Sequence, residues 1–104
     1  MISAILSESK PASGAPMVLH LSNGLPSTGT VFVMNQGDDN DRVSVALVTS
    51  GNSLSSGSYI CYQSVLHRGH SLYLQQICLG SGDEVSVTSE NGTSSFIFTG
   101  NYDQ

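Results

Sequence analysis

The chain has 104 residues, a length typical of one domain, and 38% of them are hydrophobic, which is enough for one modest core. Charged residues make up 11%, well below the average of about 25%, and the formal net charge is −5 with only three Lys and Arg residues. Nucleic acids and anionic membrane surfaces are bound by clustered cations, and Lys10, Arg42 and Arg68 are scattered, so we expect neither partner.

The N-terminal segment "MISAILSESK" has no basic residue before its short apolar stretch and so lacks the features of a secretory signal. No apolar run approaches the roughly 20 residues that span a bilayer. We therefore expect synthesis in the cytosol and reduced cysteines. Residues 1–16 are predicted to form an N-terminal strand, or arm, with a flexible link, separate from a β-sandwich domain over residues 17–104.

Short apolar segments alternate with Gly, Asn, Asp, Ser and Pro at near-regular spacing along the chain. These residue types tolerate turn geometry, and the spacing is typical of an all-β sandwich or jelly roll. We predict a single-domain antiparallel β-sandwich, jelly-roll-like, with about eight strands and no helix. The predicted strands are Ile2–Ser7, Met17–Ser22, Thr28–Asn35, Arg42–Ser50, Ser58–Leu66, Ser71–Leu79, Glu84–Ser89 and Ser94–Thr99.

Some predicted strands have one apolar face, whereas others are apolar on both faces. Val85 and Val87 alternate with polar residues, which is typical of a strand with one face on a core and one in water. The segments "TVFVMN", "MVLHL" and "SYICY" are apolar on both sides. The second face of such a strand is covered either by a subunit or partner, or by loops of the same chain.

We predict two groups of interface residues from these patterns. One group lies in the strands that are apolar on both faces, and the other lies in the N-terminal arm, which could add to the sheet edge of a neighbouring subunit. The candidate interface residues are Phe32, Met34, Tyr59 and Tyr62 in the body, and Ile2, Ile5 and Leu6 in the arm.

The cysteines and two histidines have the spacing Cys61-x5-His67-x2-His70-x7-Cys78. If "HRGH" turns a hairpin, the two cysteines come within a residue or two of facing each other. The histidines would then lie several residues away, at about 3.3 Å per residue, too far for one four-ligand site. We predict no metal and no cofactor, and a disulfide is conceivable but disfavoured in a reducing compartment.

The sequence carries no catalytic signature. Serines are plentiful, but no Gly-x-Ser-x-Gly elbow occurs, and His20 lies in an apolar segment with no acid nearby in sequence. The acidic run at residues 38–41 could attract calcium, but it lacks the Gly and the distal Glu of an EF-hand loop, so a solvated turn is favoured. We predict that the protein is not an enzyme.

The run from Val31 to Gly100 resembles small β-sandwich structural proteins of tailed bacteriophages, and the resemblance covers about two thirds of the chain. In those proteins a strand ending in Asn leads to a "V-x-V-A-L" strand, then "Y-I-x-Y-x-x-x-L", "L-x-x-x-x-I-x-L-x-x-G-D-x-V-x-V" and a final "S-F-x-x-x-G". The matching positions are Asn35, Val43, Val45, Ala46, Leu47, Tyr59, Ile60, Tyr62, Leu66, Leu72, Ile77, Leu79, Gly82, Asp83, Val85, Val87, Ser95, Phe96 and Gly100.

This sequence departs from that pattern at Cys61, where the family often carries an acidic residue, and at Gln75 and Gln76, where it often carries a charged pair. The first 27 residues match no part of the pattern. The resemblance implies a virion component made in the host cytoplasm, without catalysis and in a symmetric oligomer.

Three functions follow as hypotheses. The first is a capsid decoration or cement protein, a homotrimer that binds the major capsid protein or another virion protein and stabilises the shell through subunit contacts. The second is a tail, baseplate or fibre component of the virion, with a receptor-binding tip as one form. The third belongs to another class, a non-viral ligand-binding or metal-binding β module.

Overall fold

The computed structural model of the protein describes residues 2–22 and 24–102. All eight predicted strands are present, and their ends differ from the prediction by three residues or fewer. The described chain also has a single 3-10 turn, Ser56–Ser58, and no helix in it is long and apolar enough to cross a membrane. The strands are β1 Ile2–Ser9, β2 Met17–Leu21, β3 Ser27–Asn35, β4 Asp41–Val48, β5 Tyr59–Leu66, β6 Ser71–Leu79, β7 Glu84–Ser89 and β8 Ser94–Tyr102.

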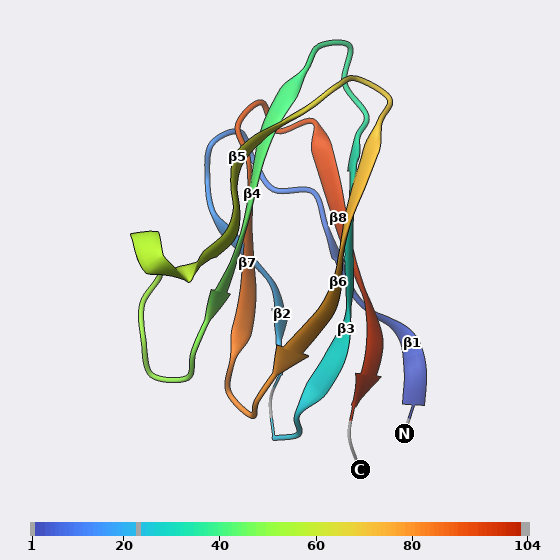
Figure 1. The fold of residues 1–104 in the computed structure, drawn as a ribbon. Helices are drawn as coiled ribbons and strands as arrows, with labels where there is room; N and C mark the ends of the chain where they lie inside the picture. The colour runs from blue at the N-terminus through green and yellow to red at the C-terminus, as the bar shows by residue number, and fades with distance from the viewer. Residues whose placement is uncertain (1, 23, 103–104) are drawn as a thin grey trace.

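The strands form two antiparallel sheets of four strands each, packed face to face (Figure 1). Sheet A has the order β1-β8-β3-β6 and sheet B has the order β2-β7-β4-β5. The pairs β1·β8, β2·β7, β3·β6 and β4·β5 are neighbours, so the chain runs as a long double-stranded ribbon that alternates between the sheets. This is the strand order of a jelly roll, and the predicted all-β sandwich is confirmed.

The core lies between the sheets and is built from alternate residues of the central strands. In sheet A the inward side chains of β3 and β8 include Val31, Val33 and Phe98, all fully buried. In sheet B the same period brings Val45 and Val87 inward, also fully buried. The two-residue repeat that was visible in the sequence therefore corresponds to the inner and outer faces of each sheet.

β1 belongs to the sandwich itself, so the prediction of a separate N-terminal arm is wrong for this structure. The strand pairs with β8 along its length, from Ile2 opposite Tyr102 to Ser9 opposite Phe96. Leu6 lies at an irregularity in this pairing and packs against the core. The edge of β8 would otherwise be unpaired, and the chain's own N-terminal strand fills it in place of a neighbour's.

The turn at His67–His70 is present, but it does not join a β5–β6 hairpin. β5 pairs with β4 in sheet B, whereas β6 pairs with β3 in sheet A, so the turn carries the chain from one sheet to the other. Cys61 packs against the core, while Cys78 is exposed on the outside of sheet A, and both are free thiols. The turn therefore crosses from one sheet to the other, and the two cysteines lie in different sheets.

Asp41 is a buried carboxylate that ties the loop ends of the two sheets together, and it is 1% exposed. Ser89 of β7 and Ser94 of β8 donate hydroxyl hydrogen bonds to its Oδ2. The backbone N–H groups of Asn91 and Arg42 donate to its Oδ1 at 2.9 Å and 2.8 Å. Burial alone would raise the pKa of this carboxyl, but these hydrogen bonds outweigh burial and lower the pKa.

Candidate functional site

The strands of sheet A are almost free of charge. β3, β6 and β8 contain no Asp, Glu, Lys or Arg, and β1 contains only Glu8. The protein nevertheless has a net charge of −5, so its charges are concentrated in the loops and in sheet B. Depletion of charge is the compositional feature that distinguishes the centre of a protein interface from other surface.

Large apolar side chains lie on the outer face of sheet A. Phe32 of β3 is paired with Ile97 of β8 on one side and with Tyr73 of β6 on the other, so the three form a row across the sheet. The rings of Phe32 and Tyr73 have their centroids 6.0 Å apart. Phe32 is 44% exposed, Tyr73 57% and Met34, two residues further along β3, 46%. These large, roughly half-exposed side chains form an apolar patch that is in contact with water when the chain is alone.

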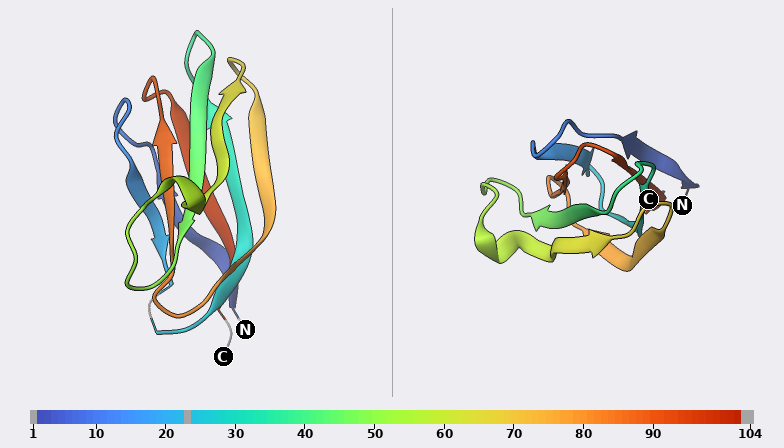
Figure 2. Two further views of the ribbon diagram at one scale, coloured as in Figure 1. Left: turned by 60° about the vertical axis from the view of Figure 1, so that its left-hand side comes forward. Right: turned by 90° about the horizontal axis from the view of Figure 1, so that it is seen from above.

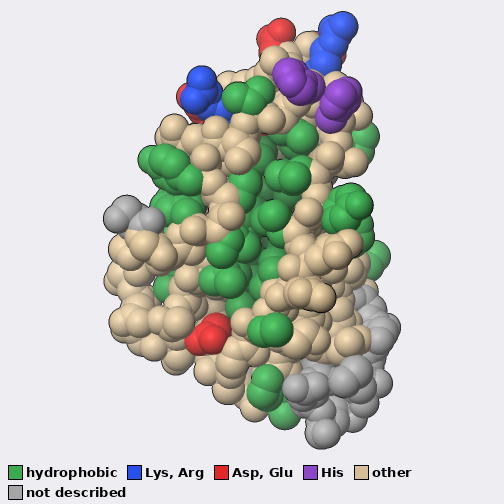
Figure 3. Space-filling view, in the orientation of Figure 1, with side chains coloured by type: hydrophobic (Ala, Val, Ile, Leu, Met, Phe, Trp, Pro, Cys, Tyr) green, Lys and Arg blue, Asp and Glu red, His purple; other side chains and the backbone are tan. Residues whose placement is uncertain are grey.

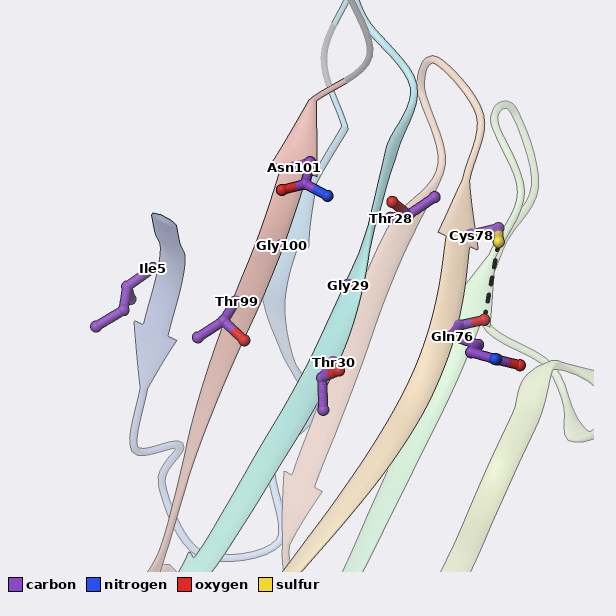
Figure 4. Close-up of a pocket in the computed structure, with 9 residues that line it drawn as sticks. All are labelled: Ile5, Thr28, Gly29, Thr30, Gln76, Cys78, Thr99, Gly100 and Asn101. Atoms are coloured by element: carbon purple, nitrogen blue, oxygen red, sulfur yellow. Dashed lines mark hydrogen bonds between the residues drawn. The ribbon is translucent and has the colours of Figure 1, made fainter. Parts of the chain in front are cut away.

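The other half of the same face is hollowed (Figure 4). The hollow has a volume of about 860 Å³. Ile5 of β1, which is 62% exposed, lies on one side of it, and Gln76 and Cys78 of β6 lie on the other. Gly29 and Gly100 face each other between them, so backbone forms the middle of the hollow.

The two glycines are required by the close approach of β3 and β8. A Cβ atom at Gly29 would lie 2.1 Å from the carbonyl oxygen of Thr99, and one at Gly100 would lie 2.0 Å from that of Thr28. These distances are shorter than any van der Waals contact, and both oxygen atoms belong to the backbone and cannot turn away. Glycine therefore keeps the strands together at this point and keeps the hollow open.

We define the sheet A face as this outer surface, from Met34 and Phe32 to the hollow beside Ile5. Three predicted interface residues, Ile5, Phe32 and Met34, lie on it together. Tyr59 and Tyr62 do not, because they lie on β5 in sheet B, where their rings meet edge to face at 4.8 Å.

The remaining predicted residues are in the first strand. Leu6 is partly buried and packs against the core. The backbone of Ile2 is paired in β1, but its side chain lies outside the described part of the structure. Tyr73 and Ile97 lie on the sheet A face as well, although neither was among the predicted interface residues. Tyr73 lies between Leu72 and Leu74 in "SLYLQ", a run that is apolar on both faces, so the signal used for Phe32 would have found it.

No metal site is built by the described residues, because no group of three or more His, Cys, Asp or Glu side chains is close enough to hold an ion. His67 and His70 lie in the exposed turn with their ring centroids 5.7 Å apart. His67 Nδ1 is 3.2 Å from Asn40 Oδ1. Within the acidic run, Asp41 is buried and its oxygens accept protein hydrogen bonds.

His20 is a buried histidine, 4% exposed, at the edge where β1 and β2 meet. Its ring stacks on Phe98 with centroids 4.8 Å apart, and its Nδ1 is 2.8 Å from the hydroxyl of Ser7. Burial lowers its pKa, because the charged imidazolium would lose its hydration there. The side chain therefore joins the two sheets in its neutral form.

Comparison with known proteins finds no family model that matches the chain and no curated protein that is significantly similar to it.

Proposed function

We propose that the protein is a virion structural protein that decorates or cements a capsid shell, and that it forms a homotrimer in which the sheet A face of each copy packs against the next copy around a threefold axis. The single observation that carries this proposal is the outer surface of sheet A, which has large exposed apolar side chains and Glu8 as the one charged residue of its strands. Phe32, Tyr73 and Met34 leave water only if another protein surface covers them, and their burial supplies the free energy of association. Contacts of this kind across subunit boundaries stabilise an assembled shell by mass action.

The size of the face supports a protein partner. Three strands of nine residues and one of eight, at about 3.3 Å per residue and about 4.8 Å apart, give a surface of about 30 Å by 19 Å. Its flat area of about 570 Å² is most of the roughly 800 Å² that each partner contributes to a standard interface. The sheet A face of one copy can thus supply most of an interface, with the adjoining loops supplying the rest.

The distribution of charge supports a second copy of this chain as the partner. Two chains that each carry a net charge of −5 repel one another wherever their acidic groups approach. The sheet A face brings only Glu8 near a neighbour, because β3, β6 and β8 carry no charged side chain. Self-association through this face therefore avoids most of the like-charge contact that other surfaces would create.

The first test is the native mass of the purified protein by light scattering, with a chelator control. We expect a metal-independent trimer. The double variant Phe32→Ser with Tyr73→Ser should shift the protein to monomer at the same concentration. The matched control is Tyr62→Ser, which removes an equally exposed tyrosine from sheet B and should leave the trimer intact. A protein that is monomeric at every concentration would refute the proposed self-association.

Cys78 provides an independent readout because it lines the hollow on this face. Its alkylation rate should fall as the protein concentration rises and the face becomes covered. An alkylation rate that stays constant across the monomer-to-trimer transition would place the subunit contact elsewhere. Addition of the purified trimer to a capsid shell, followed by measurement of shell stability, then separates decoration from a role in the tail or fibre.

A further inference from the structure

The sheet A face has two unlike halves. On the outward side of β3, Thr28 and Thr30 line the hollow. Phe32 and Met34 follow on the same strand, and their larger side chains are exposed. Phe32 is two residues from Thr30, which is about 7 Å along a strand, so a raised surface lies directly beside the hollow. We define the raised half by the side chains of Phe32, Met34, Tyr73 and Ile97.

The size of the hollow decides which surfaces of two copies can meet closely. If the raised halves of two copies met, both hollows would stay unfilled. A volume of about 860 Å³ has room for on the order of 30 water molecules, at about 30 Å³ each. The centre of a subunit interface is packed as densely as a protein interior, so such a gap is unfavourable. A raised half that enters the hollow of another copy fills it and covers its own apolar side chains.

The lining of the hollow matches the side chain of Tyr73. A buried tyrosine needs apolar contacts for its ring and a hydrogen-bond partner for its hydroxyl. Ile5 supplies an apolar wall on one side of the hollow, while Thr99 and Gln76 bring a hydroxyl and an amide to the lining (Figure 4). Both polar groups are neutral and can donate to or accept from a phenol. The hollow therefore offers the two kinds of contact that a tyrosine needs.

Few charges meet in such a contact. The described residues that line the hollow include no Asp, Glu, Lys or Arg. At the raised half, Glu8 and Lys10 have opposite charges and line one pocket at the β1 margin. Asp38, Asp39 and Arg68 lie in the loops beyond β3 and before β6, at the end of the sandwich where Figure 3 shows the histidines. The hollow thus presents no acidic group to a second copy, whose net charge is also −5.

The two halves lie one after the other along β3, with Thr30 in the hollow and Phe32 in the raised half. Each β-strand has a right-handed twist about its own axis, so the outer surface of a sheet turns along its strands. Figure 2 shows the strands of sheet A curving along their length. The two halves therefore face in different directions, as do the two contact surfaces of one subunit in a ring.

We propose that the raised half of each copy enters the hollow of the next copy in the homotrimer, with Tyr73 between Ile5 and Gln76 of its neighbour. This contact rests on the trimer proposed above and names the two surfaces that meet. Every copy gives its raised half to one neighbour and its hollow to the other. A head-to-tail contact of this kind closes as a ring, and the hollow of each subunit is completed by a residue of the next.

The experiment uses the full chain, one new thiol and a short bismaleimide cross-linker, with the products read on a denaturing gel. Cys78 lines the hollow, and Ser71→Cys places a thiol two residues from Tyr73 on the outward side of β6. Seven residues of strand separate the two thiols of one chain by about 20 Å, so a short linker joins them only between chains. Cys61→Ala removes the other native thiol.

We expect covalent trimers and no larger product, because the ring brings each new thiol beside the Cys78 of the next copy. Ser53→Cys, in the same background, is the matched control. It places an equally exposed thiol in the loop between β4 and β5, away from sheet A. The yield of cross-linked product from this control should be at least tenfold lower.

Substitutions in the two halves test the contact without a cross-linker. Thr30→Trp fills the hollow from within its own chain and should weaken trimer formation at least tenfold. Thr88→Trp, at a half-buried position on the outer side of β7 in sheet B, is its control and should leave the trimer intact. Tyr73→Phe keeps the ring but loses the hydroxyl, and should weaken trimer formation about fivefold. Thermal unfolding of each variant checks that the monomer is still folded.

Three results would overturn the proposed contact and leave self-association in place. The first is a protein that is trimeric by light scattering but gives no more cross-linking with Ser71→Cys than with Ser53→Cys. The second is a Thr30→Trp trimer as stable as the native one. The third is a covalent product that stops at two chains, because it would show a twofold contact instead of a ring. A protein that is monomeric at every concentration would instead refute the proposed self-association itself, so the two failures can be told apart.

Discussion

At the scale of single residues, two buried polar side chains decide how the protein responds to substitution and to pH. Asp41 and His20 are both buried inside the sandwich, but their surroundings favour different charge states. The first is buried with donors that stabilise its charged form, and the second is buried in surroundings that favour its neutral form. Each leads to a specific prediction.

Asp41→Asn should destabilise the protein by about 3 kcal/mol, because an amide nitrogen would then face hydrogen-bond donors in a buried site. Urea unfolding at pH 7 measures the change. Asp38→Asn, in the same loop but exposed, is the matched control and should change the free energy of unfolding by less than about 0.5 kcal/mol. Equal effects of the two substitutions would contradict the structural role given to Asp41.

The lowered pKa of Asp41 also predicts acid sensitivity. The stability that its carboxylate contributes is present above the ordinary pKa of about 3.9 and is lost as the pH falls through the lower pKa of the folded protein. Urea midpoints measured from pH 5 to pH 2 should fall less steeply in Asp41→Asn than in the native chain. Parallel curves for the two proteins would show that other carboxylates dominate acid unfolding.

His20 should make the protein less stable as the pH falls from neutrality. The unfolded chain takes up a proton near pH 6.5, whereas the folded state, whose His20 pKa is lowered, does not until a lower pH. The free energy of unfolding should therefore decline below about pH 6.5 and level off below the folded pKa. His20→Gln should remove this decline, and His70→Gln, in the exposed turn, should leave it in place.

At the scale of strands, the contact between β3 and β8 depends on a pair of glycines. Gly29→Ala should destabilise the fold by at least about 2 kcal/mol, because the new methyl group has no room beside the Thr99 carbonyl. Gly57→Ala is the control, since nothing lies within 4 Å of the new atom, and should change stability by less than about 0.5 kcal/mol. Thermal unfolding of both variants measures the difference. A tolerated alanine at residue 29 would show that the strands can separate there.

At the scale of the whole molecule, the position of β1 changes what truncation should do. A detachable arm would leave the body folded when it is removed. In the structure, removal of residues 1–9 instead exposes the edge of β8 and takes Leu6 from the core. We expect the truncated chain to lose cooperative unfolding, as measured by circular dichroism on heating, and to aggregate through the exposed edge. A truncated protein that unfolds as cooperatively as the intact one would restore the arm hypothesis.

The sequence by itself determined where the strands are. Alternation such as Val85 and Val87 with polar residues between them is a local property, and the turn residues that end each run are local as well. The prediction therefore placed all eight strands within three residues of their observed ends. It also identified Phe32 and Met34 as apolar residues on a second face and Ile5 as an interface residue of the N-terminal strand, and the structure leaves all three exposed.

Only the tertiary structure decided which strands are neighbours, because pairing joins residues far apart in the chain and the local pattern of a strand is the same beside any partner. It placed Phe32 and Tyr59 in different sheets, although both lie in segments that are apolar on two faces. It brought Asp41 into the core beside Ser94, 53 residues away, where a run of acidic residues had suggested a solvated turn. It joined β1 to β8 and left β5 and β6 each with one unpaired edge. Which strand edges remain unpaired is set by hydrogen-bond pairing across each whole sheet, and no single segment of the sequence carries that information.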